Sequence, residues 1–473
     1  MARVHGCRIP NARAGWLAVR LTVLAVVAGA LLAMAPTTSY AAGADQESLQ
    51  AKSQQVDALF ASVLGKEAPG AAVVVIQNGR ILHKQAYGLA NLELGVPNTP
   101  QTKFRLASVT KQFTAAAILQ LQEAGALSLD DPVAKSFPDI PQGDKMTLRH
   151  LLTHTSGIRD SEYGPLEFPP GERMNYTNAD YKLLGRIIEK VSGLSYEEYM
   201  RQRIFEPLAM ANSGCDHQST VLKNRASGYA IGEHGEYINA GLEDMFRTYS
   251  AGCLYSTVED MYLWDQALCG EKLLKRATIE QAFTPAKLAD GTGVPYGLGW
   301  VIARHRGLRE ISHGGDATGF NSWIDRFPDQ QFTVIVLSNI SMRPPGPLPT
   351  ATALGRKIAE IYLGDLMAQQ ELSAGVTVAP KVLETYVGRY RIQARQEVLD
   401  VSGDTLTITL EDGRLYGQDK VNRIELCPES DTEFFVKTDN STKIRFVKDA
   451  SGRVTGLVAH LMGVVEIQGT RVE

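Results

Sequence analysis

The sequence is poor in cysteine and histidine, the side chains from which proteins most often build metal sites. It has five cysteines and nine histidines among 473 residues, and none of them falls in a CxxC or HExxH spacing. Because structural and catalytic zinc sites carry such spacings, we expect neither a bound metal nor a cofactor.

Runs of basic residues are also missing. The net charge is -4, and lysine and arginine form no cluster along the chain. A protein that binds nucleic acid needs a basic surface to neutralise phosphates, so the composition excludes that partner. We expect a small molecule or a peptide as substrate, and the sequence leaves the oligomeric state open.

Long apolar runs are absent except near the N-terminus. Residues 21–35 are apolar, follow four arginines and precede a run of small residues. The run is shorter than the roughly 20 residues of a membrane span, and the small residues allow cleavage after Ala41 or Ala44. We therefore predict a signal peptide at residues 1–44, a secreted or periplasmic mature protein and no stable membrane span. An uncleaved anchor is the alternative.

Cleavage removes one cysteine, Cys7, and leaves an even number in the exported chain. Disulfides form readily outside the cytoplasm, but the remaining cysteines are too scattered to indicate a disulfide framework. Their pairing stays open for Cys215, Cys253, Cys269 and Cys427.

The order of the predicted elements indicates an α+β domain at residues 45–366. Two strands at 71–76 and 80–87 are joined by Asn78-Gly79, the strongest short hairpin signal. A long helical region follows, and strands return near residue 296. Short loops between these late strands favour antiparallel pairing, so we expect one sheet built from both ends of the domain. Late strands are predicted at 296–304, 308–312, 322–327 and 332–337, and helices at 46–64, 179–191, 350–362 and from Ser256, where Ser256 and Glu259 form a capping box.

The C-terminal part has a different pattern. Residues 367–380 lack periodicity and are predicted to be a linker. Residues 381–473 contain short alternating strands separated by turn residues, which indicates a small all-β domain, either a sandwich or a barrel.

The stretch RLASVTKQFTAAAILQLQEAG carries the first chemical signal. Its apolar residues recur at helical spacing, and Ser108 and Lys111 lie one turn apart on one face at its start. An N-cap serine beside a lysine that extends to solvent is the structural interpretation. The catalytic interpretation is an activated nucleophile, because a helix start favours developing negative charge and apolar walls favour an unprotonated lysine.

Five motifs in order make the pattern specific. They are FRLASVTKQF, LRHLLTHTSGI, PPGERMNYTNADYKLLGRIIEKVSG, YGLGW and HGGDATGF. Together they resemble the serine β-lactamase-related hydrolases, which include class C β-lactamases, D-alanyl-D-alanine carboxypeptidases, D-aminopeptidases and esterases. The resemblance spans about residues 46–364. It implies a β-lactamase/transpeptidase-like antiparallel sheet flanked by helices, with the active site between the sheet and the helical region. The C-terminal domain resembles lipocalin-like β-barrel modules.

The resemblance also implies roles for individual residues. Ser108 is expected to be the acylated nucleophile, with Lys111 as its helical partner. Tyr176, in Tyr-Thr-Asn, is expected to shuttle protons, and Asn178 to contact the substrate and Lys111. Which of Lys111 and Tyr176 is the base stays open.

The third motif, His313-Gly314-Gly315, is expected to lie on the strand that lines the cleft. There the glycines allow the substrate to approach, and the backbone N–H groups of Ser108 and Asp316 form the oxyanion hole. Penicillin-recognising relatives usually carry lysine in place of His313. Histidine is mostly neutral above its ordinary pKa of about 6.5, so we expect a weak carboxylate anchor whose charge grows as the pH falls.

Two other segments fit the same short motifs. Tyr237-Ile238-Asn239 also matches Tyr-x-Asn, and His305 opens a second His-x-Gly, but the first is expected in a polar loop and the second at a strand turn. His154 and Ser156 are expected to form a turn that supports the site. Three aromatic residues could line the cleft, although core positions are favoured for Tyr296, Trp300 and Phe320.

The sequence thus predicts an exported serine hydrolase that forms an acyl-enzyme at Ser108 and acts on esters or D-amino-acid-type amides. A class C-like β-lactamase or a penicillin-binding D-Ala-D-Ala carboxypeptidase is the alternative within this chemistry. An alternative of another class is a catalytically silent ligand-binding protein, which would have no need of an activated nucleophile.

Overall fold

The structure is a computed structural model of the chain. The predicted signal peptide lies outside the described residues as far as residue 36, and most of the predicted linker also lies outside them. Within the described part, no helix is both long and apolar enough to cross a membrane. The described residues are 37–64, 67–159, 164–232, 234–241, 243–341, 350–368, 376, 378–393, 405–418, 423–436, 439–461 and 465–472.

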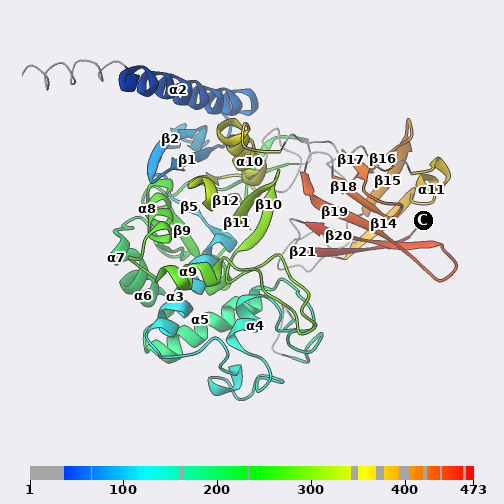
Figure 1. Cartoon of the computed structure of the whole chain (residues 1–473), viewed down its shortest axis with the longest axis horizontal. Coiled ribbons are helices and arrows are strands. Elements are labelled where there is room, and N and C mark those ends of the chain that lie inside the picture. The colour runs from blue at the N-terminus through cyan, green and yellow to red at the C-terminus, as the bar shows by residue number, and fades with distance from the viewer. Residues whose placement is uncertain are drawn as a thin grey trace, which may run out of the picture. The chain divides into compact units, whose positions relative to one another are not determined.

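A six-stranded antiparallel sheet organises the first domain (Figure 1). Its strand order is β10-β11-β12-β13-β1-β2, so the N-terminal hairpin pairs with the late strands, as the sequence predicts. β1 and β13 pair over their full lengths and consist almost wholly of buried residues, which is why this junction forms. The strands are β1 (Ala71–Gln77), β2 (Arg80–Tyr87), β10 (Val301–His305), β11 (Leu308–Ala317), β12 (Phe320–Phe327) and β13 (Phe332–Ser338).

Two of these strands differ from their predicted bounds by more than two residues. β11 does not end at Ser312 but continues to Ala317, because Gly314 and Gly315 pair with residues of β12 despite the low strand propensity of glycine. β10 begins only at Val301. The preceding segment bends at Gly299, whose φ is +83°, so the prediction of one strand over 296–304 was wrong.

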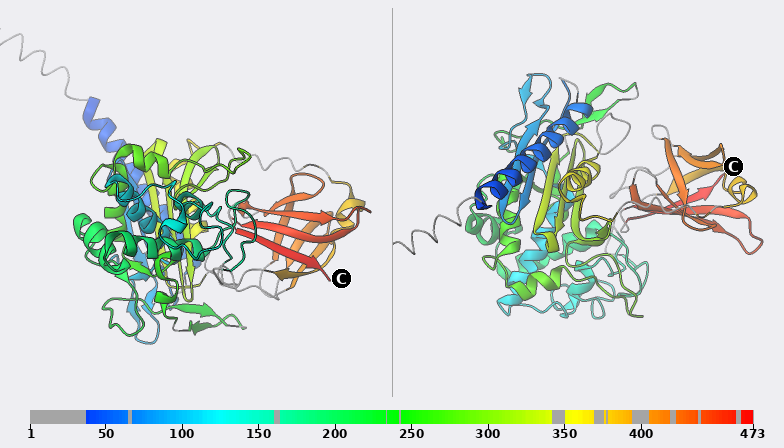
Figure 2. Two further views of the ribbon diagram at one scale, coloured as in Figure 1. Left: turned by 90° about the horizontal axis from the view of Figure 1, so that it is seen from below. Right: turned by 45° about the horizontal axis from the view of Figure 1, so that its top comes forward.

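Helices cover both faces of the sheet (Figure 2). Val74, Ile324 and Ile335 belong to the core that the sheet shares with α3 (Thr110–Glu123) and α8 (Val258–Cys269). The opposite face packs against α10 (Ala351–Leu363), where a Cβ on Gly355 would lie only 2.5 Å from Trp323 Cδ1. This arrangement is the predicted α+β fold.

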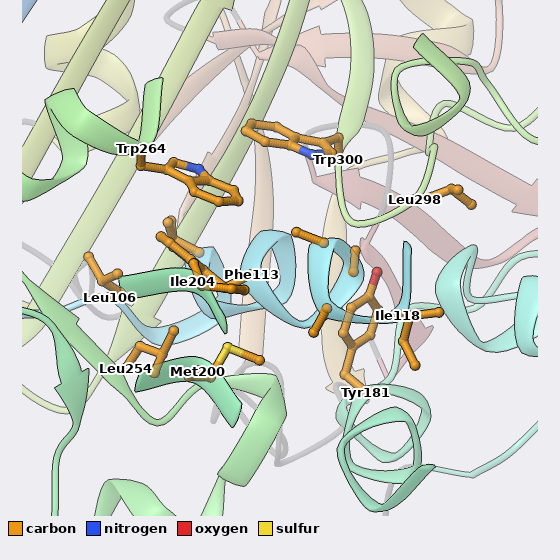
Figure 3. Packing of buried hydrophobic residues seen from close by; sticks show 14 of the residues in the cluster. Leu106, Phe113, Ile118, Tyr181, Met200, Ile204, Leu254, Trp264, Leu298 and Trp300 are labelled. Atoms are coloured by element: carbon orange, nitrogen blue, oxygen red, sulfur yellow. The ribbon is translucent and has the colours of Figure 1, made fainter. Parts of the chain in front are cut away.

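Helix α3 runs through the middle of the core (Figure 3). The ring of Phe113 stacks on that of Trp264 with centroids 4.1 Å apart. Trp264 Nε1 also donates to Gln112 Oε1 over 3.0 Å, which satisfies the indole N–H inside the core. Packing on all sides fixes this helix, and with it the residues at its start.

The start of α8 differs from the prediction. Its N-cap is Thr257, whose side chain accepts a hydrogen bond from Asp260 N, so the predicted Ser256–Glu259 capping box was wrong. Ser256 instead pairs with Ser213 Oγ over 2.8 Å, and Glu259 binds Lys84. Both partners come from distant segments, which local sequence does not reveal.

The other helices are mostly short. α2 crosses the boundary at residue 57 between the two compact units of the chain, and it begins nine residues before the predicted start at residue 46. The remaining helical elements are α2 (Thr37–Val63), α4 (Leu148–Leu152), α5 (Asn178–Ser192), α6 (Tyr196–Met200), α7 (Glu206–Leu208), α9 (Arg276–Ala282), α11 (Pro380–Glu384), the π-helix η3 (Arg201–Phe205), and the 3-10 turns η1 (Ala107–Val109), η2 (Val133–Lys135), η4 (Met245–Arg247), η5 (Tyr249–Ala251) and η6 (Pro328–Gln330).

Short strands complete the first domain. The three-stranded set β5-β9-β6 holds the segment just before η1, and β7-β8 is a small hairpin. Tyr237 lies on β8, so its predicted position in a polar loop was wrong. These strands are β3 (Leu89–Asn91), β4 (Val96–Pro97), β5 (Phe104–Arg105), β6 (Gly214–Cys215), β7 (Tyr229–Ile231), β8 (Tyr237–Asn239) and β9 (Leu254–Ser256).

The C-terminal domain is a closed eight-stranded barrel, one of the two predicted all-β architectures. Aromatic side chains fill its interior: Tyr386 stacks on Phe446 at 4.1 Å, and Phe434 meets Phe446 edge-on. The strands are β14 (Gly388–Gln393), β15 (Thr405–Glu411), β16 (Arg414–Gln418), β17 (Arg423–Pro428), β18 (Glu433–Val436), β19 (Asp439–Lys448), β20 (Val454–Leu461) and β21 (Val465–Arg471).

Candidate active site

Ser108 lies on a tight turn between β5 and α3. The turn is η1, and the α-helix itself begins two residues later at Thr110, so the expected helix start at Ser108 was wrong by this margin. Ala107 has φ +47°, an unfavourable value for alanine, and Leu106 N donates to Leu254 O over 2.8 Å. Strain held by such surrounding contacts is common at functional turns. The turn leaves Ser108 only half-buried, between buried neighbours.

Lys111 is fully buried beside the serine. Its Nζ donates to Ser108 Oγ over 3.0 Å, to Asn178 Oδ1 over 2.8 Å and to Ala251 O over 3.0 Å. An ammonium group has three N–H donors, and these three oxygens accept all of them. The structure therefore brings the predicted serine–lysine pair together and adds a main-chain acceptor.

The Tyr-Thr-Asn motif lies at the start of α5. Thr177 is the N-cap, its side chain accepting from Ala179 N, and Asn178 is the first helical residue. The nearly buried ring of Tyr176 has its centroid 4.9 Å from Lys111 Nζ. The helix start thus places both predicted side chains of this motif against the lysine.

Strand β11 closes the other side of the serine turn. A Cβ on Gly315 would lie 2.1 Å from Leu106 O and 3.0 Å from Ser108 N, so only glycine fits at this crossing. Ser322 Oγ donates to Leu106 O over 2.7 Å and ties β12 to the same turn. The next residue on β11 is the half-buried Asp316.

His313 is buried and has both ring nitrogens engaged. Nδ1 donates to Gly314 O over 2.7 Å, so Nε2 accepts from Tyr296 Oη over 2.9 Å. Burial, together with the charge of Lys111, lowers the pKa of His313 to about 3. The expected gain of positive charge near pH 6.5 was therefore wrong, because the ring stays neutral far below that pH.

Several residues of the site were missed from the sequence. The Ala251 carbonyl carries no side-chain signal, and Asp180 resembles an ordinary acidic residue in the first turn of a helix. Tyr296 was expected in the core. It is buried there, but its hydroxyl also contacts His313. Burial raises the pKa of Tyr296 well above its ordinary value, which keeps this hydroxyl a donor.

The two competing motifs lie elsewhere. Asn239 Nδ2 donates to Glu93 Oε1 over 2.7 Å, and Tyr237 pairs with Ile231 in the β7-β8 hairpin. His305 ends β10 and lies 3.5 Å from Glu360 of α10, on the far face of the sheet from α3. As for metals, no group of three or more histidine, cysteine or acidic side chains within the described ranges is arranged to hold an ion.

The arrangement places a half-buried hydroxyl beside an ammonium group and a phenol, against the backbone of a glycine-rich strand. Together with the sheet order, these features define a serine hydrolase with the β-lactamase/transpeptidase fold. Residues 56–356 match the family described as Beta-lactamase, and the chain belongs to this family. Residues 373–471 match a domain of unknown function, DUF3471.

Known proteins resemble the chain along most of its length. Penicillin-binding protein 4* of Bacillus subtilis (strain 168) is 30% identical over 434 residues, which cover 82% of this chain and 92% of that protein. The octameric penicillin-binding protein homologue from Pyrococcus abyssi has a TM-score of 0.59 and 25% identity over 88% of this chain and 99% of its own. A penicillin binding protein from Bacillus halodurans has a TM-score of 0.52 and 28% identity over 63% of this chain and 96% of its own.

Proposed function

We propose that the protein is an exported hydrolase in which Ser108 attacks the carbonyl of an ester or of a D-amino-acid-type amide. The attack forms an acyl-enzyme and releases the alcohol or amine, and water then releases the acid. The observation that carries this proposal is the contact of 3.0 Å between Lys111 Nζ and Ser108 Oγ on a strained turn. The predicted signal peptide supports export.

Tyr176 is the proposed base. Lys111 Nζ lies near two carbonyl-type oxygens, which can only accept, and near Ser108 Oγ; an ammonium group at this position satisfies all three oxygens. The ring of Tyr176 lies 4.9 Å from this cation. A neighbouring positive charge favours the phenolate, which can take the proton of Ser108 and later return it to the leaving group.

The proposed oxyanion hole consists of the main-chain N–H groups of Ser108 and Asp316. Two observations support it: a Cβ on Gly315 of β11 would lie only 3.0 Å from Ser108 N, and Asn321 Nδ2 donates to the Gly315 carbonyl over 3.0 Å. Because the strand is fixed in this way, the Asp316 N–H is already in place to donate to the oxyanion, and the strand need not move during the reaction. Such preorganised donors are the basis of electrostatic catalysis.

A substrate that carries no carboxylate near the scissile bond is the proposed preference. His313 stays neutral because burial lowers its pKa, and its two nitrogens already have partners. Arg105, three residues before the nucleophile, is bound to Asp216 over 2.7 Å and is nearly inaccessible. Neither group is placed to pair with a substrate carboxylate, as the anchoring of penicillins or of a terminal D-alanine requires.

Penicillin binding is the second candidate, and the names of the related proteins favour it. A parallel assay with p-nitrophenyl acetate and a chromogenic cephalosporin separates the two. We expect ester turnover to be lost in Ser108→Ala and kept in Ser62→Ala, an exposed serine on α2. A wild-type enzyme that turns over the cephalosporin faster than the ester would overturn the proposed preference. An active Ser108→Ala would overturn the proposed nucleophile.

A further inference from the structure

His154 is fully buried next to the Tyr-Thr-Asn motif. Its carbonyl accepts from Asn175 N over 2.8 Å, and Thr177 N lies 3.4 Å from its Nδ1. These two contacts bracket Tyr176 on both sides along the chain. His154 itself has φ +57°, in the left-handed region that few non-glycine residues adopt.

The imidazole also packs directly on the phenol. The ring centroids of His154 and Tyr176 are 4.3 Å apart, and the His154 ring lies 4.9 Å from Tyr296 and 5.1 Å from Tyr181. The imidazole is thus surrounded by three tyrosine rings. Any rotation of the Tyr176 ring away from Lys111 on that side meets the imidazole.

Asp180 fixes the orientation of this imidazole. Its Oδ2 lies 3.2 Å from His154 Nδ1, and its Oδ1 accepts from Ser156 Oγ over 2.5 Å. Burial, with the nearby charge of Lys111, lowers the pKa of His154 well below its ordinary value. The ring is therefore neutral, and its Nδ1 lies within hydrogen-bond distance of both the Asp180 carboxylate and the Thr177 N–H.

His154 Nε2 has no hydrogen-bond partner among the described residues, although it is fully buried. A buried polar atom without a partner costs about 1–3 kcal/mol. An apolar ring would fill the space without that cost, so stability alone does not explain a histidine here.

We propose that His154 is a positioning residue for Tyr176 and that Asp180 holds it in place. The proposal rests on the proposed function, in which Tyr176 takes the proton of Ser108. Asp180 lies two residues after Asn178, which binds Lys111, in the first turn of α5. The Asp180 carboxylate therefore links the loop that contains His154 to the helix that positions Asn178.

Two substitutions at this position test the proposal without backbone strain. Glycine and asparagine both tolerate the positive φ. His154→Gly removes the ring and its bond to Asp180, whereas His154→Asn keeps an N–H donor near the carboxylate and loses the ring. Thr153→Ala is the matched control, because Thr153 is a buried neighbour in the same loop whose hydroxyl bonds to Arg149 O and Thr155 Oγ1.

The measurement is inactivation by a fluorophosphonate, which reports the first-order rate constant kinact, the constant KI and the fraction of protein labelled. A displacement of the base by about 1 Å costs about 100-fold in rate, so we expect kinact to fall about 10- to 100-fold in His154→Gly. We expect a smaller loss of about 3- to 10-fold in His154→Asn. KI should stay constant in both, and Thr153→Ala should lower only the melting temperature.

A purely structural role predicts a different result, because misfolded protein lowers the labelled fraction and leaves kinact of the folded remainder unchanged. Wild-type kinact in either folded His154 variant therefore overturns the proposal. Wild-type protein that is not labelled at Ser108 overturns the proposed function instead, so the two failures are distinguishable. If His154→Gly does not fold, the comparison of His154→Asn with wild type decides alone.

Discussion

Gly315→Ala tests the close approach of β11 to the serine turn. The new Cβ would lie 2.1 Å from Leu106 O, 2.5 Å from Ser322 Oγ and 3.0 Å from Ser108 N. Real Cβ contacts essentially never fall below 3.0 Å, so the strand and the turn must separate by about 1 Å to relieve the overlap. Two backbone atoms among these neighbours cannot rotate away.

This separation would move apart the main-chain N–H groups of Ser108 and Asp316, and the expected loss of kcat follows from that movement. Loss of one oxyanion donor costs about 100- to 1000-fold in kcat, or about 2.7–4 kcal/mol of transition-state stabilisation. Overpacking lowers the free energy of unfolding by about 1–3 kcal/mol. We expect kcat for p-nitrophenyl acetate to fall at least about 100-fold in Gly315→Ala while the protein remains folded.

Gly314→Ala is the matched control on the adjacent residue. Its Cβ would come nearest to the Trp323 ring, at 3.2 and 3.3 Å, and a shift of a few tenths of an ångström relieves these contacts. We expect its kcat to stay within about threefold of wild type. Equal activity of Gly315→Ala and wild type, with circular dichroism showing both folded, would refute the reasoning that β11 must touch the serine turn.

Three further predictions follow from the same geometry. Tyr176→Phe should lower kcat for the ester about 100- to 10,000-fold because it removes the proposed base. Tyr237→Phe should leave kcat unchanged. The reverse ranking in ester hydrolysis would show that Tyr237, and not Tyr176, belongs to the catalytic Tyr-x-Asn motif. His313→Lys should raise the ratio of the cephalosporin acylation rate to the ester acylation rate about tenfold, because the lysine supplies a partner for the carboxylate. In the wild-type protein this ratio should not change between about pH 8 and about pH 5, because the pKa of His313 is about 3. Because the pKa of His313 is depressed, the unfolded chain binds a proton that the folded protein does not bind, and the free energy of unfolding should fall by about 2 kcal/mol as the pH drops from about 6.5 to about 4.5. The lowered pKa of His154 acts in the same direction. Urea titrations in which His313→Gln shows the same pH dependence as wild type would contradict the prediction.

The parts of the site that depend on local spacing were predictable from the sequence. Ser108 and Lys111 are three residues apart, so any helical turn places them together, and the structure confirms a contact of 3.0 Å. Asn178 was predicted to meet Lys111 from the resemblance, and it does so at 2.8 Å. The antiparallel sheet could also be predicted, since its strands are short, apolar and joined by recognisable turns.

Other features depend on contacts between distant segments. The glycines of β11 have low strand propensity, and only pairing with β12 keeps them in the sheet. Thr257 caps α8 because Ser256 and Glu259 are engaged by Ser213 and Lys84, which lie far away in the sequence. Local sequence patterns do not show that a side chain is bound by a distant segment and is therefore not available to cap a helix.

The protonation of His313 is a third case. The residue type gives an ordinary pKa of about 6.5, and only the structure shows that the ring is buried, lies near Lys111 and is bonded to Tyr296. The bond from Lys111 to the Ala251 carbonyl is likewise invisible in the sequence, because every residue carries the same backbone oxygen.

The central claim is an acyl-enzyme at Ser108, and mass spectrometry of rapidly quenched reactions tests it most directly. Wild-type protein mixed with p-nitrophenyl acetate should gain the mass of one acetyl group on the peptide that contains Ser108 and Lys111. The gain should disappear on longer incubation and should never form in Ser108→Ala. Acetylation of a different residue during turnover, or turnover by Ser108→Ala, would contradict the account.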